Sequence, residues 1–136
     1  MKLLIKLFFS VIILASFSSA KADTIKWLHL FSDDDLNMPG MLQAVKEFEE
    51  KTGHTVEMQY LENESFKAKL PTMLQSNDRP DIFYSWSGGV MYDQAEAGFL
   101  RDISDLVPDS YLDTVSAAAA DAFTYNGQRV GLPKQV

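Results

Sequence analysis

Cysteine is absent from the 136-residue sequence, and histidine occurs only twice, as His29 and His54. Without cysteine the protein has no disulfide scaffold, no thiolate metal site and no attachment point for a cysteine-linked lipid anchor. A domain without these supports must rely on a hydrophobic core, which a chain of this length can build. The absence therefore favours one compact domain that folds by burying apolar side chains.

Motifs for covalent or cofactor chemistry are missing as well. The sequence has no G-x-S-x-G elbow, so Ser85 and Ser87 have no hydrolase context. It also lacks the glycine-rich G-x-G-x-x-G and phosphate-binding loops. A glycosidase needs two carboxylates at a fixed separation, and the sequence alone pairs no two of its acidic residues. We therefore predict no catalytic residues and no cofactor.

The run of three aspartates that begins at Asp33 invites a calcium interpretation, which its spacing rejects. Aligned on a calcium loop, Asp33, Asp35 and Asn37 take the first, third and fifth positions. The sixth position is then Met38 instead of glycine, and the twelfth is Ala44 instead of glutamate. We predict no metal site and interpret the run as a solvated turn that complements the positive end of the following helix.

The first 22 residues have the three parts of a secretory signal peptide. Two lysines form the positive start, the mostly apolar run Leu7–Phe17 follows, and Ala20-Lys21-Ala22 offers small residues to a signal peptidase. Eleven helical residues rise about 16 Å, far less than the roughly 30 Å of a bilayer core. We therefore predict a leader cleaved before Asp23, and a mature domain over residues 23–136, in preference to a transmembrane anchor.

Acidic residues outnumber basic ones, 19 to 12, and the formal charge is −7. The predicted leader carries three of the lysines, so its removal brings the charge of the mature chain to about −10. Such a surface repels nucleic acid and anionic lipid, and we predict neither as a partner. The balance fits a soluble exported protein.

Apolar periodicity alternates between strand and helix along the mature chain. The sequence predicts strands at 24–32, 54–61, 81–84 and 129–132, and helices between Asn37 and Gly53 and at about 66–74, 90–99 and 108–123. This alternation is typical of an α/β fold, with a mostly parallel sheet flanked by helices on both faces. In the first strand, Ile25, Trp27 and His29 are expected on one face, and Lys26, Leu28 and Leu30 on the other.

Single residues predict the ends of the first two helices. Asn37 is expected to cap the first helix, with Pro39 at an early helical position. Gly53 is expected to end that helix in the left-handed conformation. Pro71 inside the second helix predicts a kink or two short helices.

The last part of the domain is predicted as a covering segment, a helix and a hairpin. Leu100, Ile103 and Leu106 are expected to lie over the core, and Pro108–Phe123 is expected to form one helix. Asn126-Gly127 is a strong signal for a two-residue hairpin turn, because both residue types tolerate positive φ.

Candidate binding residues gather in the loops that follow the predicted strands. Parallel sheets bind ligands at the carboxyl ends of their strands. Carbohydrate recognition needs an aromatic ring for the apolar face of a sugar and short polar groups for its hydroxyls. The loops supply both types: Phe31, Ser32, Asp33, Asp34, Glu62, Ser85, Trp86 and Ser87. The alternative for Trp86 is a core residue that covers the end of the sheet, and His29 is interpreted as a hydrogen-bonded structural residue.

The mature stretch resembles the extracellular solute-binding protein family 1, the periplasmic components of ABC importers, which includes maltose-, glucose- and glycerol-phosphate-binding members. No single segment is specific, and the resemblance depends on their order and spacing. The segments are Ile25–Ser32, Phe48–Val56, Lys69–Pro71, Arg79–Ile82, Ala97–Ile103 and Tyr125–Pro133.

The resemblance implies a two-lobed, monomeric periplasmic protein without catalytic activity. It closes around a mono- or oligosaccharide and delivers it to a membrane permease. Family members are commonly more than twice this length, so residues 23–136 would be the first lobe, truncated at the first crossover to the second. In similar proteins the loop after the first strand and the aromatic after the third contribute contacts. By the same resemblance Lys134 and Gln135 face the cleft.

Two alternatives remain open at this point. The sequence departs from sugar-binding relatives at Leu30 and Phe31, where those proteins often carry tryptophan. A polyamine or another cationic solute would suit the acidic cluster. An exported glycosidase-like module is the alternative from a different functional class.

Overall fold

The computed structural model describes residues 22–134. Gln135 and residues 1–21 of the predicted leader lie outside this range. The elements run in the order β1 (Thr24–His29), α1 (Met38–Thr52), β2 (Thr55–Tyr60), α2 (Asn63–Leu74), β3 (Ile82–Phe83), α3 (Gly89–Glu96), the 3₁₀ turn η1 (Ser104–Leu106), α4 (Asp109–Leu112), α5 (Ala117–Asp121), β4 (Thr124–Tyr125) and β5 (Gln128–Arg129). Within this range no helix is both long and apolar enough to cross a membrane.

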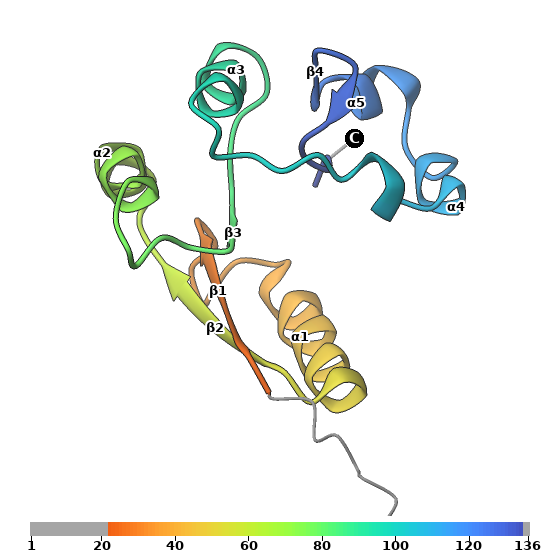
Figure 1. The fold of residues 1–136 in the computed structure, drawn as a ribbon. Helices are drawn as coiled ribbons and strands as arrows, with labels where there is room; N and C mark the ends of the chain where they lie inside the picture. The colour runs from red at the N-terminus through yellow and green to blue at the C-terminus, as the bar shows by residue number, and fades with distance from the viewer. Residues whose placement is uncertain (1–21, 135–136) are drawn as a thin grey trace, which may run out of the picture.

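The main sheet has three parallel strands in the order β2-β1-β3. Trp27 in β1 pairs with Met58 of β2 on one side and with Ile82 of β3 on the other. Helix α1 lies on one side of the sheet and α2 on the other (Figure 1). The predicted α/β lobe, with a parallel sheet flanked by helices, is confirmed.

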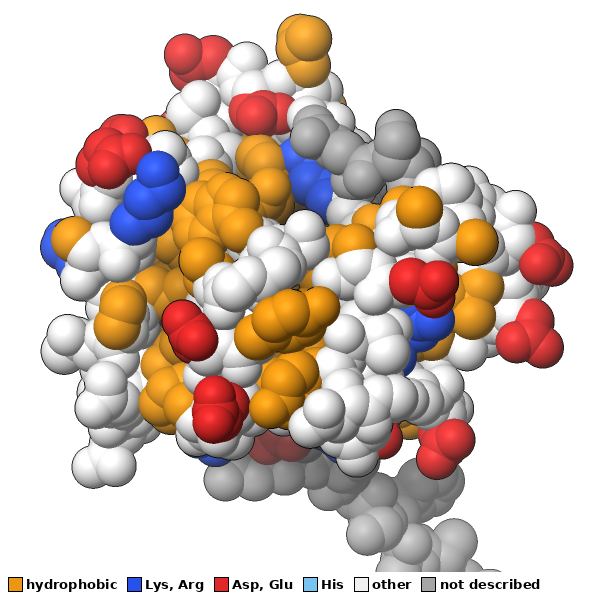
Figure 2. Space-filling model, turned by 90° about the horizontal axis from the view of Figure 1, so that it is seen from above, with side chains coloured by type: hydrophobic (Ala, Val, Ile, Leu, Met, Phe, Trp, Pro, Cys, Tyr) orange, Lys and Arg blue, Asp and Glu red, His pale blue; other side chains and the backbone are white. Residues whose placement is uncertain are grey.

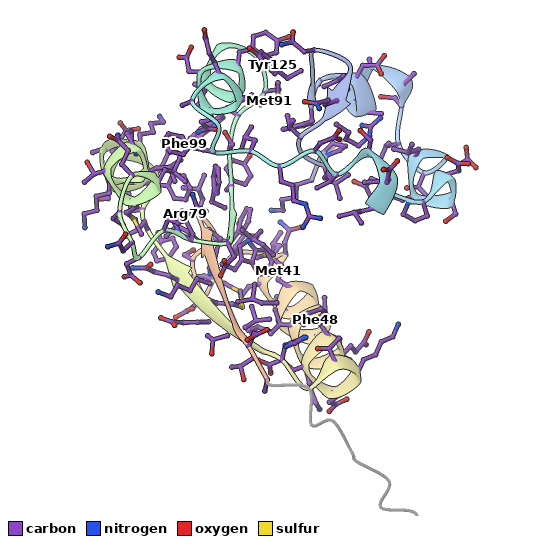
Figure 3. All side chains as sticks on the ribbon, viewed as in Figure 1. Met41, Phe48, Arg79, Met91, Phe99 and Tyr125 are labelled. Atoms are coloured by element: carbon purple, nitrogen blue, oxygen red, sulfur yellow. The ribbon has the colours of Figure 1, made fainter. Side chains whose placement is uncertain are left out.

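The core lies between the sheet and α2. Leu28 and Phe66 are fully buried, and Leu70 and Leu74 of α2 complete the central cluster. Phe99, in the segment after α3, packs against this cluster between α2 and α3 (Figure 3). Leu28 and Leu30 pack on this cluster, whereas the rings of Trp27, His29 and Phe31 contact one another in turn. The predicted alternation of β1 is therefore confirmed.

Helix α1 begins and ends close to the predicted residues, but its cap differs. Gly53 follows its last turn with φ of 74°, and its N–H reaches the Glu49 carbonyl, as the left-handed stop requires. Asn37 occupies the N-cap position, yet its side chain makes no capping bond to the helix. Its Nδ2 donates to Asp35 Oδ1 instead, so the predicted N-cap position and the early Pro39 are confirmed, whereas the expected capping bond is not made.

Helix α2 runs through Pro71 as one helix, so the two short helices considered from the sequence do not form. A proline at this position supplies no N–H for the carbonyl of Lys67. Both residues are exposed, and water can satisfy that carbonyl. Packing of the Phe66, Leu70 and Leu74 face holds the helix together across the missing bond.

The segment between residues 104 and 123 differs most from the prediction. Leu106 is 62% exposed and so does not cover the core. The single helix expected from Pro108 to Phe123 is divided into α4 and α5. Ser116 divides them, because its backbone is extended (ψ 149°) and its Oγ accepts the N–H of Ala119 at 3.2 Å to cap α5.

The hairpin at Asn126-Gly127 is confirmed. Both turn residues have positive φ, 49° and 79°, and join the antiparallel strands β4 and β5. This pair forms its own two-stranded sheet, and β5 is shorter than the strand predicted over 129–132. Arg129 fixes the hairpin to α5, since its Nη1 donates to the Ala120 carbonyl at 2.6 Å.

Candidate functional site

Three aromatic side chains form a continuous row where β1 and β3 end. We call Phe31, Tyr84 and Trp86 the aromatic row. The ring centroids of Phe31 and Tyr84 are 5.7 Å apart, those of Tyr84 and Trp86 are 5.6 Å apart, and both pairs meet edge to face. Because β1 and β3 are parallel neighbours, their carboxyl ends bring the two predicted loops together at one edge of the sheet.

Trp86 belongs to both the core and the surface. Its ring meets Phe66 edge to face, with centroids 5.9 Å apart, and it packs against the central cluster. It is nevertheless only half-buried, and the Nζ of Lys67 lies 5.7 Å from its ring centroid. Trp86 therefore covers the core, as one of its two interpretations expected, and it also presents surface to solvent.

Phe31 is contacted on several sides. His29 stacks on it with centroids 6.0 Å apart and an interplanar angle of 9°. Lys134 places its Nζ 3.2 Å from the centroid of the same ring. The structure thus brings together two predicted site residues, Phe31 and Lys134, from opposite ends of the described chain.

The loop after Phe31 is a tight polar turn. The N–H of Asp35 donates to the carbonyl of Ser32 at 3.0 Å, and the side chains of Asp33 and Asp34 are exposed. Asp35 Oδ1 accepts two hydrogen bonds at 2.8 Å, from the backbone N–H and the Nδ2 of Asn37. These two bonds, with a smaller contribution from the charge of Lys134, lower the pKa of Asp35. Sequence reasoning missed Asp35 as the residue that organises this turn.

Glu62, also a predicted site residue, caps α2. Its Oε2 accepts the backbone N–H groups of Glu64 and Ser65, at 3.0 Å and 3.3 Å. A carboxylate in this position satisfies free amides and complements the helix dipole. Glu62 therefore stabilises the start of α2, a role that sequence reasoning missed because it placed Glu62 in a polar loop.

Ser85 and Ser87 differ in their surroundings. The Ser85 hydroxyl donates to Gln94 Oε1 at 2.7 Å, and Gln94 in α3 is 9% exposed. Ser87 is exposed. Sequence reasoning missed Gln94, although its spacing from Met91, a buried residue one turn earlier, places it on the inner side of α3.

His29 is a buried structural residue, as its interpretation from the sequence expected. It is 2% exposed, and its Nδ1 accepts the backbone N–H of Phe31 at 3.3 Å. Its ring also contacts Trp27 and Tyr60. Burial lowers the pKa of His29, and the negative charge of Asp33 opposes this effect. Across residues 22–134 no group of three or more histidine or acidic side chains is placed to hold a metal ion.

All three residues of the aromatic row are partly exposed. Figure 2 looks onto the end of the molecule towards which the strands run, where broad hydrophobic areas have acidic side chains scattered among and around them. Two hollows occur elsewhere. One of about 100 Å³ adjoins Lys26 and Asp78, and a wider one of about 640 Å³ adjoins Arg79 and Phe99. Neither of these two hollows is lined by the aromatic row.

Comparison with solved structures places the fold. A protein of Caldanaerobius polysaccharolyticus from a study of xylan utilization superposes with a TM-score of 0.70 at 24% sequence identity, over 81% of this chain and 28% of that one. The Thermus thermophilus maltotriose-binding protein superposes with a TM-score of 0.62 at 23% identity, over 82% of this chain and 28% of that one. A Listeria monocytogenes ABC substrate-binding protein in complex with cycloalternan superposes with a TM-score of 0.62 at 24% identity, over 80% of this chain and 28% of that one.

At these identities the likeness concerns the fold, and the chain spans about 28% of the length of these proteins. No curated protein sequence matches. A model of the family described as bacterial extracellular solute-binding protein matches residues 35–134. These residues include most of the helices and strands described above. The chain therefore belongs to the bacterial extracellular solute-binding protein family.

Proposed function

We propose that this protein is the solute-capturing component of a bacterial ABC importer and that it binds a carbohydrate at the aromatic row. The observation that carries the proposal is the joining of Phe31, Tyr84 and Trp86 into one row at the carboxyl ends of β1 and β3. Aromatic rings suit the apolar faces of sugar rings. Exposed hydroxyl and carboxylate groups beside the row, on Asp33, Asp34 and Ser87, suit sugar hydroxyls.

The comparisons support this ligand class by analogy. Two of the similar structures are described with maltotriose and with cycloalternan, both carbohydrates. The family consists of binding proteins, so we expect capture without turnover. The ligand class proposed for this chain is a mono- or oligosaccharide.

The partial exposure of the row suggests how binding would work. A ligand on a partly exposed row stays in contact with solvent, whereas small-molecule sites enclose most of a ligand. We propose that residues 23–136 are the first lobe and that a second lobe closes over the row when sugar bridges the two. The ligand would stabilise the closed form through contacts that the open form lacks. The closed, monomeric protein would then deliver the sugar to a permease from the periplasm.

The test is binding by the full natural chain. Isothermal titration with maltotriose, mannotriose, xylotriose and galactose should give saturable binding of at least one sugar. The 136 residues contain two tryptophans, Trp27 and Trp86, so variants of each can show by fluorescence whether the ligand lies beside Trp86. A sugar-dependent emission change should persist in Trp27→Phe and be reduced in Trp86→Phe. No response to any sugar in the panel would contradict the proposal.

The same preparation separates the alternatives. Binding of spermidine, weakened by salt and without sugar binding, would support a cationic solute and a role for the acidic turn. Release of a chromophore from nitrophenyl glycosides, abolished by one carboxylate change, would support a glycosidase. We expect neither result.

A further inference from the structure

We propose that Lys134 is a removable cover on Phe31 that competes with the ligand and thereby sets the affinity and selectivity of the aromatic row. The inference rests on the proposed function, because it concerns access to the same row. It assigns Lys134 a role opposite to a direct ligand contact. The contact that carries it is the Lys134 Nζ, 3.2 Å from the centroid of the Phe31 ring.

The surroundings of Phe31 leave few ways to reach its ring. His29 stacks against it at 6.0 Å, and Tyr84 meets it edge to face at 5.7 Å. His29 is buried and is bonded to the Phe31 N–H, so it belongs to the fixed interior. Lys134 is exposed and carries a long flexible side chain. Of these three neighbours Lys134 can move away at the lowest cost.

The contact is attractive but weak enough to exchange. A lysine ammonium over a phenyl ring at an exposed site is stabilised by about 0.5–1 kcal/mol. A sugar ring that stacks on the same face must first displace the ammonium and so loses that amount of affinity. The cover therefore favours ligands that stack over an extended area and disfavours small ligands that gain little from Phe31.

The displaced ammonium has a nearby partner in Asp35. The positive charge of Lys134 already contributes to the lowered pKa of Asp35. Both hydrogen bonds from Asn37 go to Asp35 Oδ1, which leaves Oδ2 to receive the ammonium. The Lys134 ammonium can thus move from the Phe31 ring to the Asp35 carboxylate and keep a negatively charged partner. This movement costs less free energy than a movement of the ammonium from the ring into water.

The decisive variant is Lys134→Ala in the full natural chain. Isothermal titration with the sugar that the wild type binds should show affinity raised by about 2- to 5-fold. Lys134→Met keeps an apolar chain over the ring and should raise it less. Lys46→Ala removes the same charge from an exposed site on α1 and should leave affinity unchanged. Unchanged or weakened binding in Lys134→Ala overturns the proposal.

Two further measurements separate the cover from general effects. In a Phe31→Leu background, Lys134→Ala should no longer change affinity, because the ring that it uncovers is gone. Independently of any ligand, NMR of protein with ¹³C-labelled lysine should show the Lys134 ε-methylene protons shifted upfield by the ring, and this shift should vanish in Phe31→Leu. If the upfield shift is absent, the proposal that Lys134 covers Phe31 is overturned. If the shift is present but the protein binds no sugar, only the proposed function is contradicted.

Discussion

Trp86 rests edge-on against the fully buried Phe66, with ring centroids 5.9 Å apart and planes at 86°. The side chain that we propose to stack on a ligand therefore also packs against the hydrophobic core. Under the proposed function, ligand binding and stability depend on the same side chain, and changes at Trp86 must be judged by both.

Trp86→Ala should weaken sugar binding and also destabilise the protein. The loss of a half-buried indole and its edge-to-face contacts should lower the free energy of unfolding by about 2 kcal/mol. Affinity should fall by about ten-fold or more, as for buried aromatic anchors at interfaces. Urea unfolding and isothermal titration measure the two effects. Trp86→Phe should recover most of the stability, and full stability in Trp86→Ala would contradict the packing described.

Glu62→Ala should destabilise α2 and leave binding almost unchanged. The substitution frees the N–H groups of Glu64 and Ser65, and the lost cap should cost about 1 kcal/mol. Glu62→Asp, which retains a carboxylate acceptor, should lose less. The measurement is the urea midpoint of the three proteins. A large loss of affinity without loss of stability would instead make Glu62 a ligand contact, as the sequence first suggested.

His29 should make stability fall in mild acid. Burial lowers its pKa below the usual 6.5, so the unfolded chain binds a proton more readily than the folded one. The stabilisation is complete above pH 6.5 and is lost as the pH falls from 6.5 towards the lowered pKa of the folded protein. Asn at this position can still accept the Phe31 N–H but does not titrate.

The check is the free energy of unfolding from pH 8 to 5. His29→Asn should show a shallower decline than the wild type, because acidic groups contribute equally to both. Equal slopes in wild type and His29→Asn would show that the folded protein protonates His29 freely.

Two glycines at opposite ends of α1 should respond in opposite directions to alanine. Gly53 has φ of 74°, which an L side chain rarely adopts, so Gly53→Ala should destabilise by about 1 kcal/mol. Gly40 lies in the helix without positive φ, and an added Cβ meets nothing within 4 Å. Gly40→Ala should therefore stabilise by about 0.5–1 kcal/mol. Thermal unfolding of both variants tests the pair, and stabilisation by Gly53→Ala would contradict the left-handed stop.

Local signals predicted those parts of the fold that depend on one or two residues. Gly53 and Asn126-Gly127 were identified correctly because positive φ restricts the residue types that fit. The strands and their parallel pairing followed from apolar periodicity. The break at Ser116 was missed because an alanine-rich run reads as continuous helix, whereas the serine hydroxyl caps a new one. At Pro71 the opposite error occurred: a break into two helices was considered, but α2 continues, because the packing of one helix face outweighed the missing hydrogen bond.

The sequence predicted where the candidate site lies on the sheet, but it did not predict the contacts among the site residues. Strand order brought the loops after β1 and β3 together, so Phe31 and Trp86 could be expected at one edge. The position of Lys134 on Phe31 depends on how the chain returns after the hairpin, which periodicity does not encode. The capping role of Glu62 depends on where α2 begins, and the sequence placed that start three residues too late.

Strand β1 is the first strand of the described residues and the central one in its sheet. Its partners lie far along the sequence: Asp23 bonds to His54, 31 residues away, and Lys26 bonds to Asp81, 55 residues away. Pairings over such distances form slowly, because the chain must first be closed into long loops. Until Ile82 has been synthesised, one side of β1 has no partner, and an unpaired strand edge can join another chain. The order of the strands therefore exposes the growing polypeptide to aggregation until β3 has been made.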